Sequence, residues 1–503
     1  MDEEQYDLKK NINTKLTMVS GTGWRGSAEA FRIAWTAIVV LILASILDPI
    51  AFGLIGMTDA LVQFFNVFMT MGFDSAIIQQ EKVNNRILST LFWLNLLLGV
   101  VLAGVGTAVS PLLSWFYQDN RVGPIFIALS MTFILQSFAV IQRGLLARKM
   151  AFRSLAIVDI LATIISSLFA IIVALRGGSY WSLVVLQLGK HAVMSLGYWL
   201  SSPWRPQRLF DLSTTMPSVQ FSGNILLYNL LNFIATRSDI ILVGRLLGPE
   251  QAGFYLLANR LIMTPVGQVL NVIMQTLYPI LSALQTEIAK VRETYIKVVV
   301  ATFSGLAPAI LVAGIVGTLL IPYYLGEQWG ALVPIFLVWC FGALQRIVMS
   351  RLSILYLSMG RPDLQWKYQL VSTPVIILAL VFGVRQGALG ASISYNLAQF
   401  FTSFLSIYLA FSLIDLGMGA YFKRFRYSLA ALLVALAVGT GFLYGVGQFA
   451  WHPLLISGLI GLGTLAVYAL VLYLLDPFAR QLWADARSWL PKRASLCKSG
   501  KEI

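Results

Sequence analysis

The sequence predicts an all-α polytopic membrane protein with 14 transmembrane helices, arranged as two pseudo-symmetric six-helix lobes plus two C-terminal helices. Composition is the first indication, since 58% of the 503 residues are hydrophobic and only 12% are charged. A typical soluble protein has about 25% charged residues. The second indication is a series of long apolar runs, and the third is a motif that recurs about 200 residues later in the chain. These patterns exclude a soluble globular domain.

Fourteen apolar runs are long enough to be transmembrane helices, because a helix needs ~20 apolar residues to cross a bilayer. The third run shows the pattern most clearly, since residues 87–110 contain no charged side chain. The runs are, in order, 27–47, 51–78, 87–114, 122–141, 154–175, 180–200, 218–247, 251–280, 296–320, 329–357, 368–384, 387–413, 428–448 and 453–475.

The positions of these runs also divide the chain into parts. The first 23 residues are polar and lack the apolar core of a cleavable signal, so the first run is expected to be a permanent span. Gly248 and Pro249 separate the seventh run from the eighth, because glycine can end a helix and proline suits the first turn of the next. The predicted parts are a cytoplasmic N-terminal segment (1–23), an N-lobe with helices 1–6 (24–212), a C-lobe with helices 7–12 (213–416), two additional helices 13 and 14 (417–475) and a basic cytoplasmic tail (476–503).

Basic residues are distributed unequally between alternate loops. The even-numbered loops and the adjoining span ends contain sixteen lysines and arginines, whereas the odd-numbered loops and their adjoining span ends contain four, which are Arg121, Arg176, Arg245 and Arg385. Because cytoplasmic loops carry the excess of positive charge, we expect the even loops and both termini to lie in the cytoplasm, with the protein in the inner membrane. A miscounted helix would scramble this bias, so the bias also supports the count of spans.

A short motif after the first span recurs after the seventh. Residues 43–54 read "LASILDPIAFGL" and residues 243–254 read "VGRLLGPEQAGF". The matching pairs are Leu47 with Leu247, Pro49 with Pro249, and Gly53 with Gly253. The offset spans six helices, which is an even number, so both halves insert with the same orientation. We therefore expect an internal repeat whose axis runs along the membrane normal.

Polar side chains recur at helical spacing on the spans that flank this motif. Residues three and four apart share one face of a helix, and matching polar faces occur in the first, second, seventh and eighth spans. One polar stripe more often reflects contact between helices, but four stripes at matching places favour a shared watery interior. The stripe residues predicted to line a substrate path are Asp59, Gln63, Asn66, Thr70, Asn229, Asn232, Thr236, Thr264, Asn271 and Gln275.

Ionisable side chains inside the spans indicate functional positions, because each costs ~2.5–3.5 kcal/mol on membrane-insertion scales. The basic residues predicted to line the path are Arg32, Lys190, Arg237, Arg260, Arg346 and Arg351. The embedded acids are fewer, and two of them, Asp59 and Asp239, are candidates for ion coupling. An excess of cations suits an anionic cargo, since arginine binds phosphate through a planar fork of donors. The alternative for Arg260 is a structural pair with an acid such as Asp59.

The residues of common catalytic and metal sites are missing. The chain has two histidines and two cysteines, too few for a metal constellation. It also lacks a Walker loop, a GxSxG motif and a large outer loop that could hold paired carboxylates. We therefore expect a protein that is not an enzyme and has neither metal nor cofactor. The net charge of +14 suits nucleic acid in a soluble protein, but here it marks cytoplasmic loops, so nucleic acid is not an expected partner.

Two stretches carry a resemblance to a known family. They are "DALVQFFNVFMTMGFDSAIIQQEKVN" (59–84) and "NLLNFIATRSDIILVGRLLGPEQAGFYLLANRLIMTPV" (229–266). Both resemble the Wzx-type lipid-linked oligosaccharide flippases, in particular exporters of colanic acid and similar exopolysaccharides. These belong to the polysaccharide transporter family of the multidrug/oligosaccharidyl-lipid/polysaccharide exporter superfamily. Asp239, Gly244 and Gly248 match the family's Asp…Gly…Gly pattern, whereas Arg237 stands where a neutral polar residue is expected.

The resemblance implies a flippase that moves undecaprenyl-pyrophosphate-linked oligosaccharide across the inner membrane by alternating access, for exopolysaccharide, O-antigen or capsule biosynthesis. Its expected partners are the lipid-linked anionic oligosaccharide, the lipid bilayer, and the polymerase and export machinery. Two alternatives stay open. One is a drug or metabolite exporter of the same superfamily, against which the cationic excess argues. The other is a membrane-embedded polysaccharide polymerase or ligase, against which the repeat argues.

Overall fold

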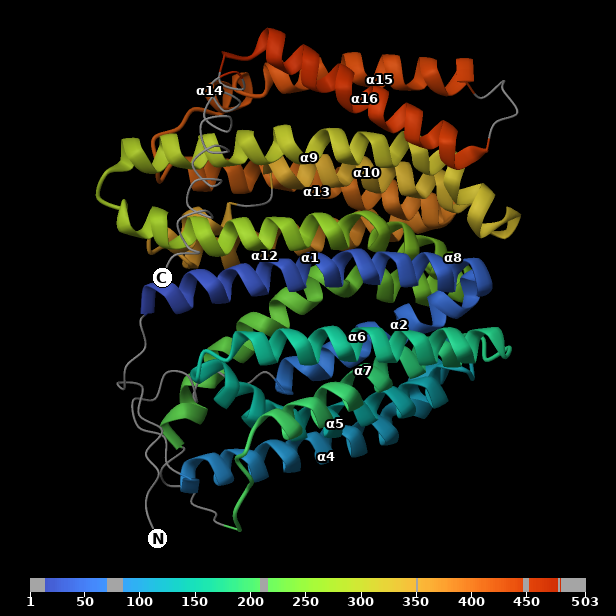
Figure 1. Ribbon diagram of the computed structural model, residues 1–503, viewed down its shortest axis with the longest axis vertical. Coiled ribbons are helices and arrows are strands. Elements are labelled where there is room, and N and C mark those ends of the chain that lie inside the picture. The colour runs from blue at the N-terminus through green and yellow to red at the C-terminus, as the bar shows by residue number, and fades with distance from the viewer. Residues whose placement is uncertain are drawn as a thin grey trace, which may run out of the picture. The chain divides into compact units, whose positions relative to one another are not determined.

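The computed structural model describes residues 14–69, 85–208, 216–349, 352–446, 452–477 and 480, and every regular element within these ranges is a helix (Figure 1). The earlier helices are α1 (Thr14–Ile46), α2 (Pro49–Met69), α4 (Asn85–Tyr117), α5 (Val122–Arg148), α6 (Phe152–Leu175), α7 (Tyr180–Ser201) and α8 (Met216–Ala283). The later helices are α9 (Ile288–Leu325), α10 (Leu332–Met349), α11 (Ser353–Ser358), α12 (Asp363–Gly383), α13 (Gly387–Phe411), α14 (Met418–Lys423), α15 (Arg426–Val446) and α16 (Pro453–Leu475). Two short 3₁₀ turns are η1 (Glu327–Trp329) and η2 (Val384–Gln386).

Within the described residues, each of the fourteen predicted spans overlaps a helix, whereas residues 70–78 of the second span, 350–351 of the tenth and 447–448 of the thirteenth lie outside the described residues. α8 accounts for the seventh and eighth spans, because Gly248 with φ 79° and ψ 179° interrupts it. Among the described residues, ten helical segments are long and apolar enough to cross a membrane. Two of these, Thr236–Ala283 and Asp363–Phe411, are long enough for two crossings at 1.5 Å per residue. The predicted all-helical, polytopic class therefore agrees with the observed helices.

Several helices extend beyond the predicted apolar runs. α1 begins at Thr14 although its run begins near residue 27, and α9 begins at Ile288 although its run begins at 296. α5 continues to Arg148, past the predicted end at 141. The physical reason is that hydropathy locates only the part of a helix that suits hydrocarbon. Backbone hydrogen bonding continues wherever the following residues tolerate helical geometry.

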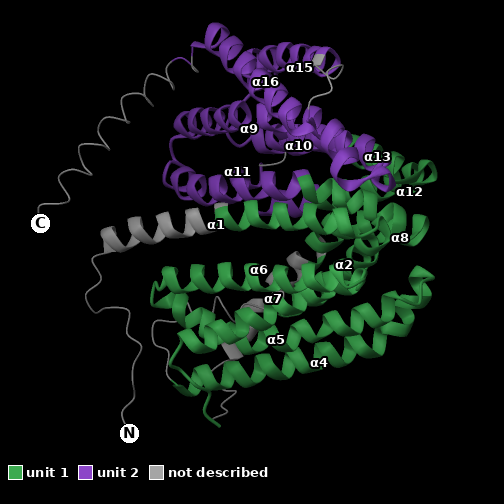
Figure 2. Ribbon diagram, turned by 45° about the vertical axis from the view of Figure 1, so that its right-hand side comes forward, with its two compact units in different colours: residues 1–261, 369–398 green, residues 262–368, 399–503 purple. Residues whose placement is uncertain are grey.

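The chain forms two compact units, which are described separately. Unit 1 comprises residues 1–261 and 369–398, and unit 2 comprises residues 262–368 and 399–503 (Figure 2). The boundary between the units therefore falls inside α8, α12 and α13 rather than between sequence repeats. The predicted lobes, 24–212 and 213–416, remain a prediction about how the repeats are related.

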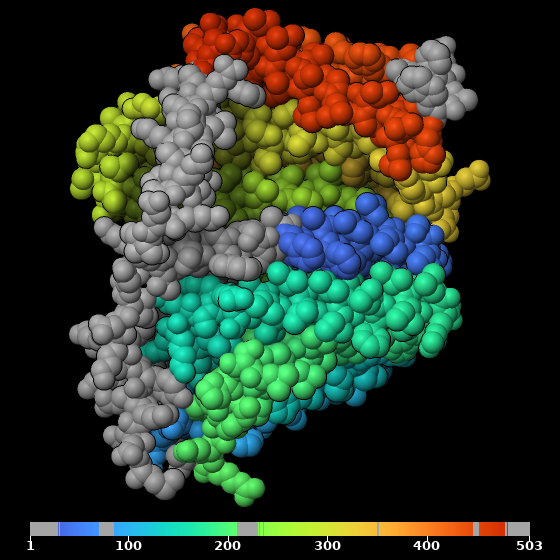
Figure 3. All heavy atoms as spheres, in the orientation of Figure 1, coloured from blue at the N-terminus to red at the C-terminus, as the bar shows by residue number. Residues whose placement is uncertain are grey.

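In unit 1, α4 packs against α5, α6 packs against α7, and α1 packs against α6. Figure 3 shows the surface of α1, in blue, bordering the surface of α6, in teal. A hydrogen bond from Trp35 Nε1 to Ser167 Oγ, 2.9 Å long, joins α1 to α6. The polar indole edge is thereby satisfied without leaving the helix interface.

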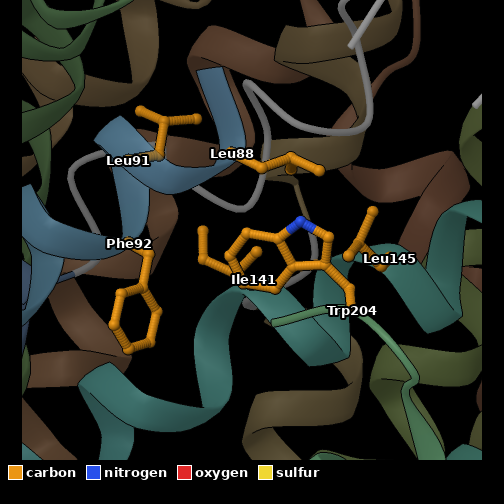
Figure 4. Close-up of a cluster of buried hydrophobic side chains, with 6 residues drawn as sticks. All are labelled: Leu88, Leu91, Phe92, Ile141, Leu145 and Trp204. Carbon is orange, nitrogen blue, oxygen red and sulfur yellow. The ribbon is translucent and has the colours of Figure 1, made fainter. Parts of the chain in front are cut away.

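A buried apolar cluster anchors the segment that follows α7. Its members are Leu88, Leu91 and Phe92 of α4, Ile141 and Leu145 of α5, and Trp204 (Figure 4). None of them is more than 5% exposed. The indole Nε1 of Trp204 donates to Asn85 Oδ1 at 3.2 Å. The tryptophan therefore fixes the chain after α7 onto the α4–α5 pair through both packing and a hydrogen bond.

In unit 2, α9 packs against α10, α15 and α16, and α15 packs against α16. The hydroxyls of Ser304 and Ser428 lie 2.7 Å apart and join α9 to α15. A small cluster of Ala431, Ala435, Tyr468 and Leu472 fills the α15–α16 interface. The two C-terminal helices are therefore packed onto α9 rather than onto each other alone.

Candidate functional site

The two copies of the repeated motif touch each other within unit 1. A Cβ atom built on Gly53 would lie 2.9 Å from the backbone nitrogen of Gly253, and nearer still to the carbonyl oxygen of Pro249. A Cβ atom on Gly253 would lie 3.2 Å from Pro49 Cα, and nearer still to the carbonyl oxygen of Pro49. Only glycine leaves room for such a backbone contact. The contact is reciprocal, as two copies related by a two-fold axis require.

Less than two helical turns further along, Asp59 of α2 and Arg260 of α8 form an ion pair. The distance between Arg260 Nη2 and Asp59 Oδ2 is 3.3 Å, and the two side chains are 31% and 20% exposed. Gln63 Nε2 donates to the same carboxylate oxygen at 2.9 Å. Asp59 and Arg260 are 201 positions apart, so they occupy nearly equivalent places in the two repeats. α2 and this part of α8 consequently run in the same direction, as an axis along the membrane normal requires.

A second group of charges lies on α1, α6 and α7. Arg32 Nε of α1 donates to Glu29 Oε2 at 2.9 Å. On α6, Asp159 Oδ1 accepts a hydrogen bond of 2.6 Å from Tyr198 Oη. Lys190 of α7 lies close enough to interact electrostatically with both carboxylates and with the Arg32 guanidinium. These side chains therefore form one network across three helices.

The neighbouring residue His191 connects this network to the ion pair. His191 is close enough to Asp59 for an electrostatic interaction, whereas Lys190 interacts with the charges of α1 and α6. Adjacent residues on a helix point about 100° apart, so the two side chains face different neighbours. The sequence did not determine which of the two side chains faces the interior. In the structure, Lys190 lies near the charges of α1 and α6, and His191 lies near Asp59.

Two of the predicted path cations in unit 1 already have a carboxylate partner. Arg260 has the carboxylate of Asp59 at 3.3 Å, and Arg32 has that of Glu29 at 2.9 Å. An anionic ligand at either arginine must compete with a carboxylate that is already present. The pair that the sequence offered as an alternative role for Arg260 is therefore formed in this structure.

The remaining predicted residues are distributed over both units. In unit 1, Asn232 Oδ1 accepts from Gln369 Nε2 at 3.3 Å, and Thr236 is exposed and bonds to its own helix. The half-buried residues of unit 1 include Asn66 and Arg237. Unit 2 contains the exposed Thr264, Asn271 and Gln275 of α8 and the half-buried Arg346 of α10. Thr70, Arg351 and the side chain of Asn229 lie outside the described residues. A single cavity lined by all of them stays a prediction.

Asp239 of α8 has partners that the sequence did not identify. Its side chain is 7% exposed, and Oδ2 accepts from Tyr255 Oη at 2.9 Å. The sequence indicated only that Asp239 needed a partner other than the nearby Arg237. A distance of 16 residues across the Gly248 kink carries no periodic signal, so this pair was not predictable. The Glu29–Arg32 pair, by contrast, has a spacing of three that helical geometry favours.

Comparison with known proteins identifies the family of this chain. Residues 42–334 match the family described as polysaccharide biosynthesis protein, which is more than half of the chain. The chain belongs to this family. The lipopolysaccharide biosynthesis protein WzxC of Escherichia coli (strain K12) is 24% identical to it over 436 residues, covering 84% of this chain and 87% of WzxC. The teichuronic acid biosynthesis protein TuaB of Bacillus subtilis (strain 168) is 25% identical over 404 residues, covering 77% and 83%.

Solved structures of similar fold are membrane transporters. The lipid II flippase MurJ, in an inward closed conformation, has a TM-score of 0.70 at 14% identity, covering 91% of this polysaccharide biosynthesis protein and 99% of MurJ. An inward-facing multidrug resistance MATE family transporter of the MOP superfamily has a TM-score of 0.62 at 12% identity, covering 76% and 94%. Identities this low establish the fold alone. The predicted family and polytopic fold are confirmed, and the protein is a multi-pass membrane protein.

Proposed function

We propose that this polysaccharide biosynthesis protein is a flippase that moves a lipid-linked anionic oligosaccharide across the inner membrane by alternating access. The observation that carries the proposal is the Asp59–Arg260 pair, because it places a partly exposed cation at the contact between the two repeats. The names of WzxC and TuaB, which refer to lipopolysaccharide and teichuronic acid biosynthesis, support a polysaccharide precursor as cargo. The protein acts as a transporter, not as an enzyme.

The ion pair suggests how a diphosphate is captured. Without substrate, Asp59 neutralises Arg260, and this avoids an unpaired charge at membrane depth. A substrate diphosphate offers more acceptor oxygens than one carboxylate and replaces Asp59 as the partner of Arg260. The displaced carboxylate then becomes free to bind a cation or a proton. Asp59 is therefore the first candidate for coupling transport to the movement of an ion, and the buried Asp239 is the second.

The other predicted residues extend the path of the substrate. Lys190 and Arg32, which lie in the charge network of α1, α6 and α7, are proposed to supply further positive charge to the path, and Arg237, Arg346 and Arg351 are proposed to do so elsewhere on it. The polar stripes solvate the sugars, and the prenyl chain stays in lipid. The polymerase and the export machinery are proposed as partners that receive the flipped substrate.

The proposed orientation has both termini in the cytoplasm, and reporter fusions test it directly. Fusions after Arg121, Arg245 and Arg385 are expected to report the periplasm. Fusions after Arg153, Arg208 and Arg426 are expected to report the cytoplasm. Two adjacent fusions on the wrong side would show that a helix was miscounted.

A reconstituted transport assay tests the function. Purified protein in vesicles is supplied with a fluorescent polyprenyl-pyrophosphate oligosaccharide, and the fraction that reaches the opposite leaflet is measured by quenching. Loss of one charge-assisted phosphate contact is worth about 1.5–3 kcal/mol. Arg260→Ala should therefore slow transport about ten- to a hundredfold, while Arg121→Ala, a loop variant, leaves it unchanged.

The double variant Asp59→Ala/Arg260→Ala separates the two roles of the arginine. If Arg260 binds substrate, the double variant folds but neither binds nor transports the lipid-linked substrate, whereas loss of coupling at Asp59 alone would leave substrate binding intact. If Arg260 is only structural, removing both partners restores protein level and transport together, and the substrate role is wrong. Transport of a cationic drug without transport of the lipid-linked sugar would instead favour the exporter alternative, which the MATE-like fold also accommodates.

A further inference from the structure

A basic pocket in unit 2 is not explained by the transport reaction. Its volume is about 690 Å³, and residues from the start of α9, from α14, from the start of α15 and from just after α16 line it. The cations on its wall are Arg292, Lys297, Lys423, Arg424 and Arg426, and the carboxylates are Glu293 and Asp476. Ile296 and Val300 add an apolar side. The pocket lining thus combines an excess of cations with apolar side chains.

The pocket lies at the charged ends of three apolar helices. α15 begins with Arg426 and has no other charge through Val446, a length of about 31 Å at 1.5 Å per residue. This matches the ~30 Å hydrocarbon core of a bilayer. α9 has no charge after Lys297, and α16 has none before Asp476. Because α9, α15 and α16 pack together (Figure 1), we expect their charged ends to meet at the height of the lipid headgroups.

The cations of the pocket are not all matched by protein groups. Lys297 pairs with Glu293 at 2.6 Å, and Arg292 Nη1 donates to the backbone oxygen of Asp415 at 2.9 Å. Within the described part of the chain, neither Lys423 nor Arg424 forms an ion pair within 4 Å, and Arg424 lies only close enough to Glu293 for a longer-range electrostatic interaction. Two adjacent lysine and arginine side chains on one wall therefore present donors to an anion from outside the protein.

We propose that this pocket binds the phosphate headgroup of an anionic phospholipid, whose acyl chains leave along Ile296 and Val300. The even-loop charge bias places the pocket on the cytoplasmic side, where anionic lipids are enriched and each surface cation adds to their attraction. A phospholipid fits better than the transported lipid, because α14, α15 and α16 are predicted to lie outside the two six-helix repeats. The site is also in a different unit from the Asp59–Arg260 pair.

Native mass spectrometry of the full-length protein in detergent tests the proposal. The protein is titrated with short-chain phosphatidylglycerol and, separately, with phosphatidylcholine, and bound lipids are counted. We expect phosphatidylglycerol to bind more tightly. Each lost charge-assisted contact to the phosphate weakens binding about tenfold or more, so Lys423→Gln/Arg424→Gln should weaken phosphatidylglycerol binding about a hundredfold. Phosphatidylcholine binding should not change.

A matched control removes the same charge elsewhere in unit 2. Lys290 and Arg361 are exposed, pair with Glu287 and Asp363, and do not line the pocket. Lys290→Gln/Arg361→Gln should keep the phosphatidylglycerol preference. An equal loss in this control would show only general surface attraction and overturn the site. Because both variants could fold less well, the salt dependence of wild-type binding is a second measurement, and salt-independent binding would contradict a charged pocket.

Two further ligands identify the source of the phosphate. Inorganic phosphate at millimolar concentration should displace little phosphatidylglycerol, because the apolar wall contributes to binding; full displacement would mean that the pocket recognises free anions. A polyprenyl pyrophosphate that binds more tightly than phosphatidylglycerol, and is lost in Lys423→Gln/Arg424→Gln, would make this an acceptor site for the transported lipid and overturn the assignment.

Discussion

The close contact at Gly53 predicts that replacing this glycine by alanine destabilises the protein, whereas the same change in most helices stabilises it. In the interior of a helix, replacing glycine by alanine normally stabilises by about 0.5–1 kcal/mol, because alanine loses less backbone entropy. At Gly53, however, the added Cβ would meet the carbonyl oxygen of Pro249 and the nitrogen of Gly253. These are backbone atoms, which cannot rotate away as a side chain does, so the two helices must separate.

The expected magnitude follows from these opposing terms. Overpacking a tight contact costs about 1–3 kcal/mol, and the gain in helix propensity offsets less than about 1 kcal/mol of it. Gly53→Ala is therefore expected to destabilise the protein by about 1–2 kcal/mol. Gly253→Ala should behave alike, because the contact is reciprocal. Since both changes disturb one contact, the double variant should lose less than the sum of the two.

The measurement is the thermal midpoint at which purified protein in detergent loses its monodisperse state. Gly104→Ala is the matched control, because Gly104 lies within α4 and a Cβ there has no atom within 4 Å. Its midpoint should be unchanged or slightly raised. If Gly53→Ala and Gly104→Ala shift the midpoint equally, or if the two contact variants are additive, the helices do not touch as described.

Three further variants have defined outcomes in the same assay. Trp204→Ala should destabilise by about 3–5 kcal/mol, because it empties the α4–α5 cluster, whereas Trp115→Ala, whose side chain is 74% exposed, should change little; equal losses would contradict the anchor. Gly248→Ala should cost about 1–3 kcal/mol, because its backbone conformation is nearly restricted to glycine, and an unchanged midpoint would argue against the kink. A hydrogen bond from Arg121 lowers the pKa of Asp119, so this pair stabilises the fold above the pKa of an unfolded aspartate and stops doing so as pH falls through the lowered value. Asp119→Asn should therefore lose up to about 1 kcal/mol at neutral pH and nothing in acid; a difference that persists in acid would exclude the pair as its cause.

The spans and the repeat could be predicted from the sequence because both leave linear signals. An apolar run of ~20 residues indicates a membrane helix. The repeat is visible as a constant offset of about 200 residues, as between Gly53 and Gly253. The ends of the helices could not be placed, since polar extensions such as Thr14 to residue 26 in α1 have no hydropathy signal. The Glu29–Arg32 pair was not predicted, although its spacing of three residues is one that helical geometry favours.

The hydrogen-bond and ion-pair partners within the candidate site were harder to predict from the sequence. Sequence periodicity indicates which residues share a face, but not how far that face is rotated toward a given neighbour. Tyr198 and Asp159 are 39 residues apart and meet only because α6 and α7 pack together. Lys190 and His191 differ in their surroundings for the same reason. Asp59 was named as one acid that Arg260 could pair with, but choosing it over Asp239 required the packing of α2 on α8.

The reciprocal glycine contact also bears on the origin of the chain. A protein of half the length, carrying one copy of the motif, would form the same contact with a second copy of itself, because a two-fold interface uses one patch twice. Each glycine would then face the equivalent backbone of its twin. The Asp59–Arg260 pair has no such precursor, since near the axis an identical twin would place acid near acid or base near base. The contact thus fits an ancestral homodimer, whereas the opposite charges required two gene halves that had become free to differ.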